Sequence, residues 1–87
     1  MAVYVDDAAI VWRSKKRFHL CADSVSELHE FAQRAAINKC WFHRKSRYPH
    51  YDVTEPQREV ALSLGATALT SRDLVMHMRQ LALTEKA

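Results

Sequence analysis

The chain has 87 residues, of which 48% are hydrophobic and 26% are charged, so we expect one small folded domain over residues 1–87 rather than a disordered chain. One glycine and two prolines exclude collagen-like and low-complexity proteins. No apolar run reaches the ~18 residues of a membrane span, and the N-terminal residues lack the basic-then-apolar pattern of a secretory signal. We therefore expect a soluble, cytoplasmic protein with no membrane partner.

Basic residues outnumber acidic ones by 13 to 10, which gives a net charge of +3. Eight of the thirteen lie in two short segments, residues 13–17 and 39–47. An anionic partner such as a nucleotide or a nucleic acid is one interpretation, and two solvated loops are the other. Cys21 and Cys40 form no metal-binding motif, so we expect two reduced, buried thiols.

In chain order, residues 2–5 form a β-prone run that ends at two aspartates. A short strand is predicted over 10–12 and another over 18–22, where apolar residues occupy alternate positions. Ser24 and Glu27 make a capping box, and the apolar spacing that follows predicts a helix. Asn38 is the expected end of this helix.

Residues 40–43 predict a strand rich in aromatic side chains, and a basic loop leads to a further strand at 50–53. Thr54 begins a second helix that ends at Gly65. A short strand over 66–69 and a third helix capped by Thr70 or Ser71 complete the chain. This order predicts an α/β domain whose mixed or mostly parallel sheet has four or five short strands packed by three helices.

Acidic and imidazole side chains follow the predicted strands, and in a parallel sheet such ends share one edge, where ligands bind. Candidate metal ligands are Asp6, Asp7 and Asp52, whose oxygens suit Mg²⁺ or Mn²⁺. Candidate catalytic groups are Asp6, Asp7, His19 and His50. His43 and Asp23 are expected at the same edge. The alternative is that these residues only end strands and cap helices.

The segment from His43 to Asp52 combines fixed charges, imidazoles and tyrosines directly after Trp41 and Phe42. Such a loop can bind phosphate through cations and stack bases on its rings. The candidate ligand-binding residues are Arg44, Lys45, Arg47, Tyr48 and Tyr51, with Trp41 as a further stacking surface. The alternative interpretation places the aromatic rings in the core and leaves the charges as solvated surface.

Several motifs in this chain resemble a small bacterial and phage domain family of unknown function, number 4031 in its series. They include Val3-Tyr4-Val5-Asp6-Asp7, His19-Leu20-x-Ala22-Asp23 and His50-Tyr51-Asp52-Val53. The resemblance spans residues 3 to about 75 and implies that these acids and histidines belong to the family pattern. It implies no activity, and the unusually basic loop before His50 departs from the pattern.

Three functional hypotheses follow from these residues. The first is a module that binds a phosphate-bearing ligand, a nucleotide or a nucleic acid, in a pocket lined by histidine, aspartate and arginine. The second is a metal-dependent, nuclease-like hydrolase of phosphodiesters. The third is a non-enzymatic interaction or host-modulating module, in which the apolar stripe of the third helix forms a homodimer or partner interface.

Overall fold

A central sheet of six strands organises the computed structural model, which describes residues 2–44 and 48–86 and, in the last helix, side chains up to residue 82. The strands are β1 (Val3–Val5), β2 (Ile10–Trp12), β3 (Lys15–Ala22), β4 (Phe42–His43), β5 (His50–Thr54) and β6 (Thr67–Ala68). The helices are α1 (Val25–Arg34), α2 (Glu55–Ser63) and α3 (Ser71–Lys86), with a short 3₁₀ helix, η1 (Lys39–Trp41). The predicted α/β class is confirmed.

The sheet is mixed, with strand order β4-β5-β3-β1-β6 and β2 paired to β3. Only the β1–β6 pair is parallel among the described strands. The antiparallel β2–β3 pair turns at Arg13 and Ser14, whose φ angles are 51° and 65°, as a type I′ hairpin requires. Neither residue is the asparagine or glycine that is typical of such a turn. The sequence therefore predicted the two strands but not that they pair as a hairpin.

Local capping sets the helix boundaries. The Ser24 side chain accepts a hydrogen bond from the Glu27 amide at the start of α1, and Thr54 with Gln57 completes a capping box at the start of α2. The chain turns left-handed at Ala36, whose φ is 57°, so α1 ends before Asn38.

Asn38 instead caps η1, because its side-chain oxygen accepts a hydrogen bond from the Cys40 amide. Residues 40–43 are therefore a 3₁₀ turn followed by a two-residue strand, not one continuous strand. The prediction that both cysteines are buried is wrong for Cys40, which lies in this turn and is exposed.

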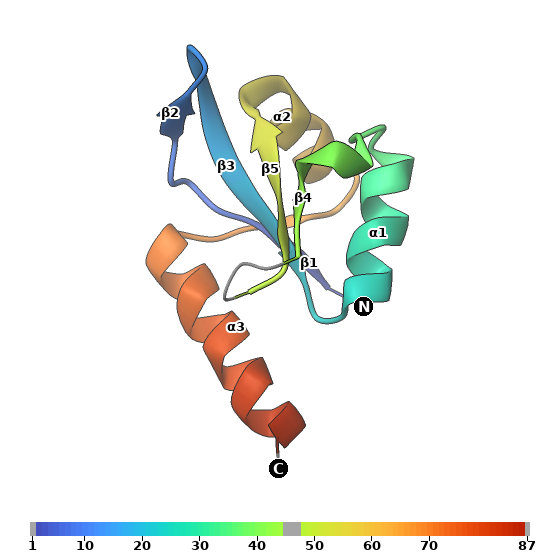
Figure 1. Ribbon diagram of the computed structural model, residues 1–87, viewed down its shortest axis with the longest axis vertical. Coiled ribbons are helices and arrows are strands. Elements are labelled where there is room, and N and C mark those ends of the chain that lie inside the picture. The colour runs from blue at the N-terminus through green and yellow to red at the C-terminus, as the bar shows by residue number, and fades with distance from the viewer. Residues whose placement is uncertain (1, 45–47, 87) are drawn as a thin grey trace.

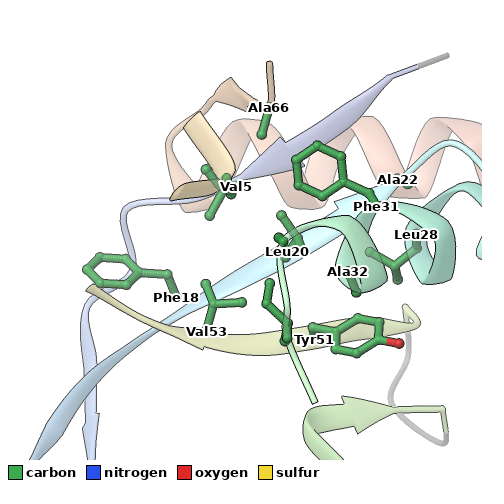
Figure 2. Close-up of a cluster of buried hydrophobic side chains, with 13 residues drawn as sticks. Val5, Phe18, Leu20, Ala22, Leu28, Phe31, Ala32, Tyr51, Val53 and Ala66 are labelled. Carbon is green, nitrogen blue, oxygen red and sulfur yellow. The ribbon is translucent and has the colours of Figure 1, made fainter. Parts of the chain in front are cut away.

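The main core lies between one face of the sheet and helices α1 and α2. Figure 2 shows Leu28, Phe31 and Ala32 of α1 beside Leu20 of β3 and Tyr51 of β5. These side chains are buried, and apolar burial of this kind contributes about 25 cal/mol for each Å² removed from water. Because side chains alternate along a strand, the neighbours of Leu20 and Tyr51 must face the other side of the sheet.

Helix α3 packs on that other face, where Leu74 and Met78 contact Cys21 of β3. Figure 1 shows α3 apart from α1 and α2, extending from the sheet toward the C-terminus. Much of this second face is therefore left uncovered by helices. Among the described residues, no helix has both the length and the apolar character needed to cross a membrane.

Candidate functional site

Four polar side chains of the candidate site share the sheet face opposite the α1–α2 core. His19 on β3 pairs with Asp52 on β5, and His43 on β4 pairs with His50 on β5. Directly opposed residues project to the same face of a sheet. Antiparallel pairing, rather than the ends of parallel strands, therefore brings these groups together.

Asp6 follows β1 and lies beneath this cluster, with only 2% of its surface exposed. Its Oδ2 atom lies 2.7 Å from His19 Nδ1, and its Oδ1 accepts hydrogen bonds from the amides of His19 (2.8 Å) and Ala8 (3.2 Å). An ionised carboxylate can only accept, so His19 Nδ1 carries a proton. In the neutral ring, His19 Nε2 then presents a lone pair.

The pKa values of this pair move in opposite directions. Burial acts to raise the pKa of Asp6, but the hydrogen bonds from His19 and Ala8 together lower it below its ordinary value. The hydrogen bond to Asp6 raises the pKa of His19, and burial opposes that rise only in part. Both shifts favour a charged pair in the folded protein.

The pKa of His50 moves in the direction opposite to that of His19. Its Nδ1 lies 2.9 Å from the Tyr48 carbonyl oxygen, which can only accept, so Nδ1 donates. Burial lowers the pKa of His50 below its ordinary value, and the charges of His19 and His43 add to this effect, whereas the hydrogen bond to Tyr48 and the charge of Asp52 oppose it in part. When the ring is neutral, with its proton on Nδ1, the lone pair of Nε2 faces Asp52 Oδ1, 3.3 Å away. In that state two acceptors face each other.

One atom from each of His19, His50 and Asp52 lies within 4.8 Å of the others. We call these three residues the His–Asp cluster. Two ligands on a tetrahedral Zn²⁺ ion, each about 2.1 Å from the metal, are about 3.4 Å apart. The separation of His50 and Asp52 already matches that spacing, and a shift of somewhat over 1 Å would bring in the third atom. Two nitrogens and one oxygen suit Zn²⁺, Mn²⁺ or Fe²⁺ better than Mg²⁺.

A cavity of about 150 Å³ lies beside the cluster, between the sheet and α3. Its polar lining comes from Asp6, His19, His50 and Tyr48, and its apolar lining from α3. Cys21 also lines it, but burial raises the pKa of this thiol to about 12. The thiol stays protonated near neutral pH and is a poor nucleophile.

A family model described as a protein of unknown function, DUF4031, matches residues 3–81. The chain belongs to this family. The predicted resemblance is thereby confirmed over nearly the whole sequence. Neither a curated protein nor a solved structure matched the chain.

Several predicted site residues of this DUF4031 member lie away from the cluster. Asp7 accepts a hydrogen bond from the Ser71 amide (2.9 Å), at the start of α3. Asp23 pairs with His77 of α3 at 2.9 Å. The structure thus groups Asp52 with two histidines and not with Asp7, while Asp6 contacts the cluster through His19.

The predicted ligand-binding residues are also separated. Tyr51 is 1% exposed on the core face, where its hydroxyl lies 2.7 Å from His29 Nδ1. Tyr48 lines the cavity, and Arg44 is exposed after β4. Lys45 and Arg47 lie outside the described residues.

Sequence reasoning missed Arg17, which lies on the His19 face of β3. It belongs to the basic segment 13–17, for which an anionic partner and a solvated loop both stay open, and no site role is predicted for it; its surface is only 8% exposed. The alternation that separates His19 from Phe18 and Leu20, continued back by one step, would have placed Arg17 beside the cluster.

Proposed function

We propose that this protein binds a divalent transition-metal ion at His19, His50 and Asp52 and hydrolyses a phosphodiester there. The observation that supports this most strongly is the meeting of His50 Nε2 with Asp52 Oδ1 at 3.3 Å. A cation between two facing acceptors removes their repulsion. The hydrogen bonds on the far sides of both imidazoles are those that commonly orient metal-bound histidines.

A metal ion at this position supplies a Lewis acid and lowers the pKa of a coordinated water. In the proposed reaction, water oxygen bonds to phosphorus, the bond from phosphorus to the leaving oxygen breaks, and a phosphate monoester and an alcohol result. The proton lost by water is returned to the leaving oxygen. His43 is placed to transfer it, because its ring is half-exposed and its Nε2 lies 2.8 Å from Asp52.

The phosphate-bearing ligand expected from the basic loop is retained as the substrate, but the interaction-module hypothesis has less support. Leu74 and Met78, two residues of the α3 stripe, pack within the chain against Cys21. A stripe used for internal packing leaves less apolar surface for a second copy. A cytoplasmic location stays part of the proposal, since both cysteines are free.

Cobalt binding tests the metal site, because Co²⁺ reports its own coordination through visible absorption. We expect one Co²⁺ per chain in the wild type and an affinity at least about tenfold lower in His50→Ala. His77→Ala is the matched control, since it removes a histidine paired with Asp23 outside the cluster. Equal binding by all three proteins, or none by the wild type, would overturn the metal site.

Hydrolysis is measured separately with bis(p-nitrophenyl) phosphate, in the presence of Zn²⁺ or Mn²⁺ and after chelation. We expect release of nitrophenol that requires the ion and is lost in His50→Ala. If the protein binds cobalt but hydrolyses nothing in the presence of Zn²⁺ or Mn²⁺, it is a metal-binding protein and the proposed hydrolase activity is refuted.

A further inference from the structure

A buried arginine between two indole rings lies next to the His–Asp cluster. The Arg17 guanidinium carbon is 4.4 Å from the centre of the Trp41 ring and 5.8 Å from that of Trp12. The two indoles meet edge to face at 5.9 Å. Trp12 is 47% exposed despite these contacts, so its ring is available to a ligand. We call these three residues the Trp–Arg–Trp site.

The charge of Arg17 has no counter-ion within the described part of the chain. The Arg17 Nε atom is shielded from solvent and has no hydrogen-bond partner there. The guanidinium forms no salt bridge or hydrogen bond with the other described residues. A buried charge without a hydrogen-bonded partner is costly. Stacking on indole offsets only part of that cost, so the site is suited to an incoming anion. A guanidinium binds phosphate oxygens through two parallel hydrogen bonds.

The strand register places the Trp–Arg–Trp site on the same sheet face as the cluster. Arg17 is two residues before His19 on β3 and pairs with Thr54, two residues beyond Asp52 on β5. At about 3.3 Å per residue, the backbones of Arg17 and His19 are about 7 Å apart. One extended ligand can therefore contact both sites.

Positive charge continues along the β2–β3 hairpin away from the cluster. Lys15 and Lys16 are exposed there, and the Arg13 guanidinium lies 4.5 Å from the Trp12 ring. A basic track with exposed aromatic rings is the usual surface for single-stranded nucleic acid, where cations follow the phosphates and bases stack on the rings. A compact anion would use Arg17 but not the hairpin.

We propose that the Trp–Arg–Trp site binds single-stranded nucleic acid, with a phosphate on Arg17 and a base stacked on Trp12. This inference rests on the proposed function, because the bound nucleic acid would supply the phosphodiester that the His–Asp cluster hydrolyses. Binding itself does not require the metal. The two claims can therefore fail independently.

Intrinsic fluorescence reads this site alone, because the chain has two tryptophans and both belong to it. The wild type is titrated with a short oligothymidylate in EDTA, at two salt concentrations. We expect saturable quenching and an affinity that falls steeply as salt rises. A parallel titration with thymidine monophosphate distinguishes the strand from a single nucleotide.

Arg17→Gln is expected to weaken oligothymidylate binding at least about tenfold, and Trp12→Ala by a similar factor. Arg34→Gln is the matched control, since that guanidinium lies 5.9 Å from the Phe31 ring on another element, and its affinity should equal that of the wild type. Trp12→Ala removes a half-exposed side chain, so it keeps the test valid if circular dichroism shows that Arg17→Gln is unfolded. Binding to Trp12→Ala is then followed by the remaining tryptophan and by fluorescence anisotropy of labelled oligonucleotide.

No quenching of the wild type, or equal affinity in Trp12→Ala and Arg34→Gln, would overturn the proposal. Equal affinity for the monophosphate and the oligonucleotide would refute single-stranded nucleic acid as the ligand. Cobalt binding by the same preparations shows whether the metal site stands or falls separately.

Discussion

Replacing Asp6 with asparagine tests whether this carboxylate orients His19. The substitution preserves side-chain volume, and the amide oxygen can still accept from the backbone amides of His19 and Ala8. The amide nitrogen is a donor, however, so it conflicts with a protonated His19 Nδ1 or forces the ring proton onto Nε2. In the first case the ring is pushed out of its orientation, and in the second Nε2 carries the proton and no longer presents a lone pair to a metal.

The cost follows from the contacts of a carboxylate that is 2% exposed. Asp6→Asn removes one charge-assisted bond of 2.7 Å and weakens those of 2.8 and 3.2 Å. Hydrogen bonds to charged groups contribute about 1.5–3 kcal/mol each. We therefore expect the free energy of unfolding of the metal-free protein to fall by about 2–3 kcal/mol, and Tm by about 10–20 °C in a domain of this size.

Urea denaturation in EDTA at pH 7 measures the stability of this variant, and a cobalt titration measures the affinity of the cluster. We expect the affinity to fall about 10–100-fold, as when a group that orients a metal ligand is lost. Asp7→Asn is the control, because Asp7 is exposed and contacts the start of α3. A loss of stability with unchanged cobalt affinity would make Asp6 purely structural, and a stability within about 0.5 kcal/mol of the wild type would refute the reasoning altogether.

Three further expectations concern pH, the core and a helix cap. Because the pKa of Asp6 is lowered on folding, its contribution to stability is present above pH 3.8 and is lost as the pH falls through the pKa of the folded protein. Because the pKa of His19 is raised, its contribution is present below pH 6.5 and is lost as the pH rises through the pKa of the folded protein. The stability difference between wild type and Asp6→Asn should therefore be largest between these limits, and urea curves at pH 5.5 and 9 that gave equal differences would contradict it. Tyr51→Phe should cost about 1 kcal/mol in urea denaturation, because His29 loses its 2.7 Å partner, yet leave oligothymidylate affinity unchanged; a large loss of affinity would restore Tyr51 to the ligand site. Thr54→Ala should cost about 1 kcal/mol through the lost cap of α2, and an unchanged urea midpoint would show that the cap contributes nothing.

Features encoded within a few residues were predictable from the sequence. The capping residues Ser24 and Thr54 and the left-handed stop at Gly65 follow from local backbone chemistry, and all three are present. Alternation in β3 correctly placed His19 on the face opposite Phe18 and Leu20. These signals need no knowledge of the partner strand.

Features that depend on distant pairing were not predictable in the same way. The sequence predicts that Asp6, His19 and His50 meet at one edge formed by parallel strand ends. They do lie close together, but over the middle of an antiparallel pairing between β3 and β5. That register joins residues more than thirty positions apart. A shift of one residue in the pairing would point the Asp52 side chain toward the core.

The chain also contains a His–Asp pair that separates a structural role from the proposed metal site. His77 Nε2 lies 2.9 Å from Asp23 Oδ1, and its ring packs at 4.5 Å on Tyr4. A proton on that nitrogen satisfies the pair, which ties α3 to the end of β3 with no ion needed. At His50 the Tyr48 carbonyl engages the proton on Nδ1, so in the neutral ring the nitrogen that faces Asp52 has none to donate. The proximity of imidazole and carboxylate is common to both pairs, whereas the lone pair that the neutral His50 ring directs at Asp52 is what supports the proposed metal site.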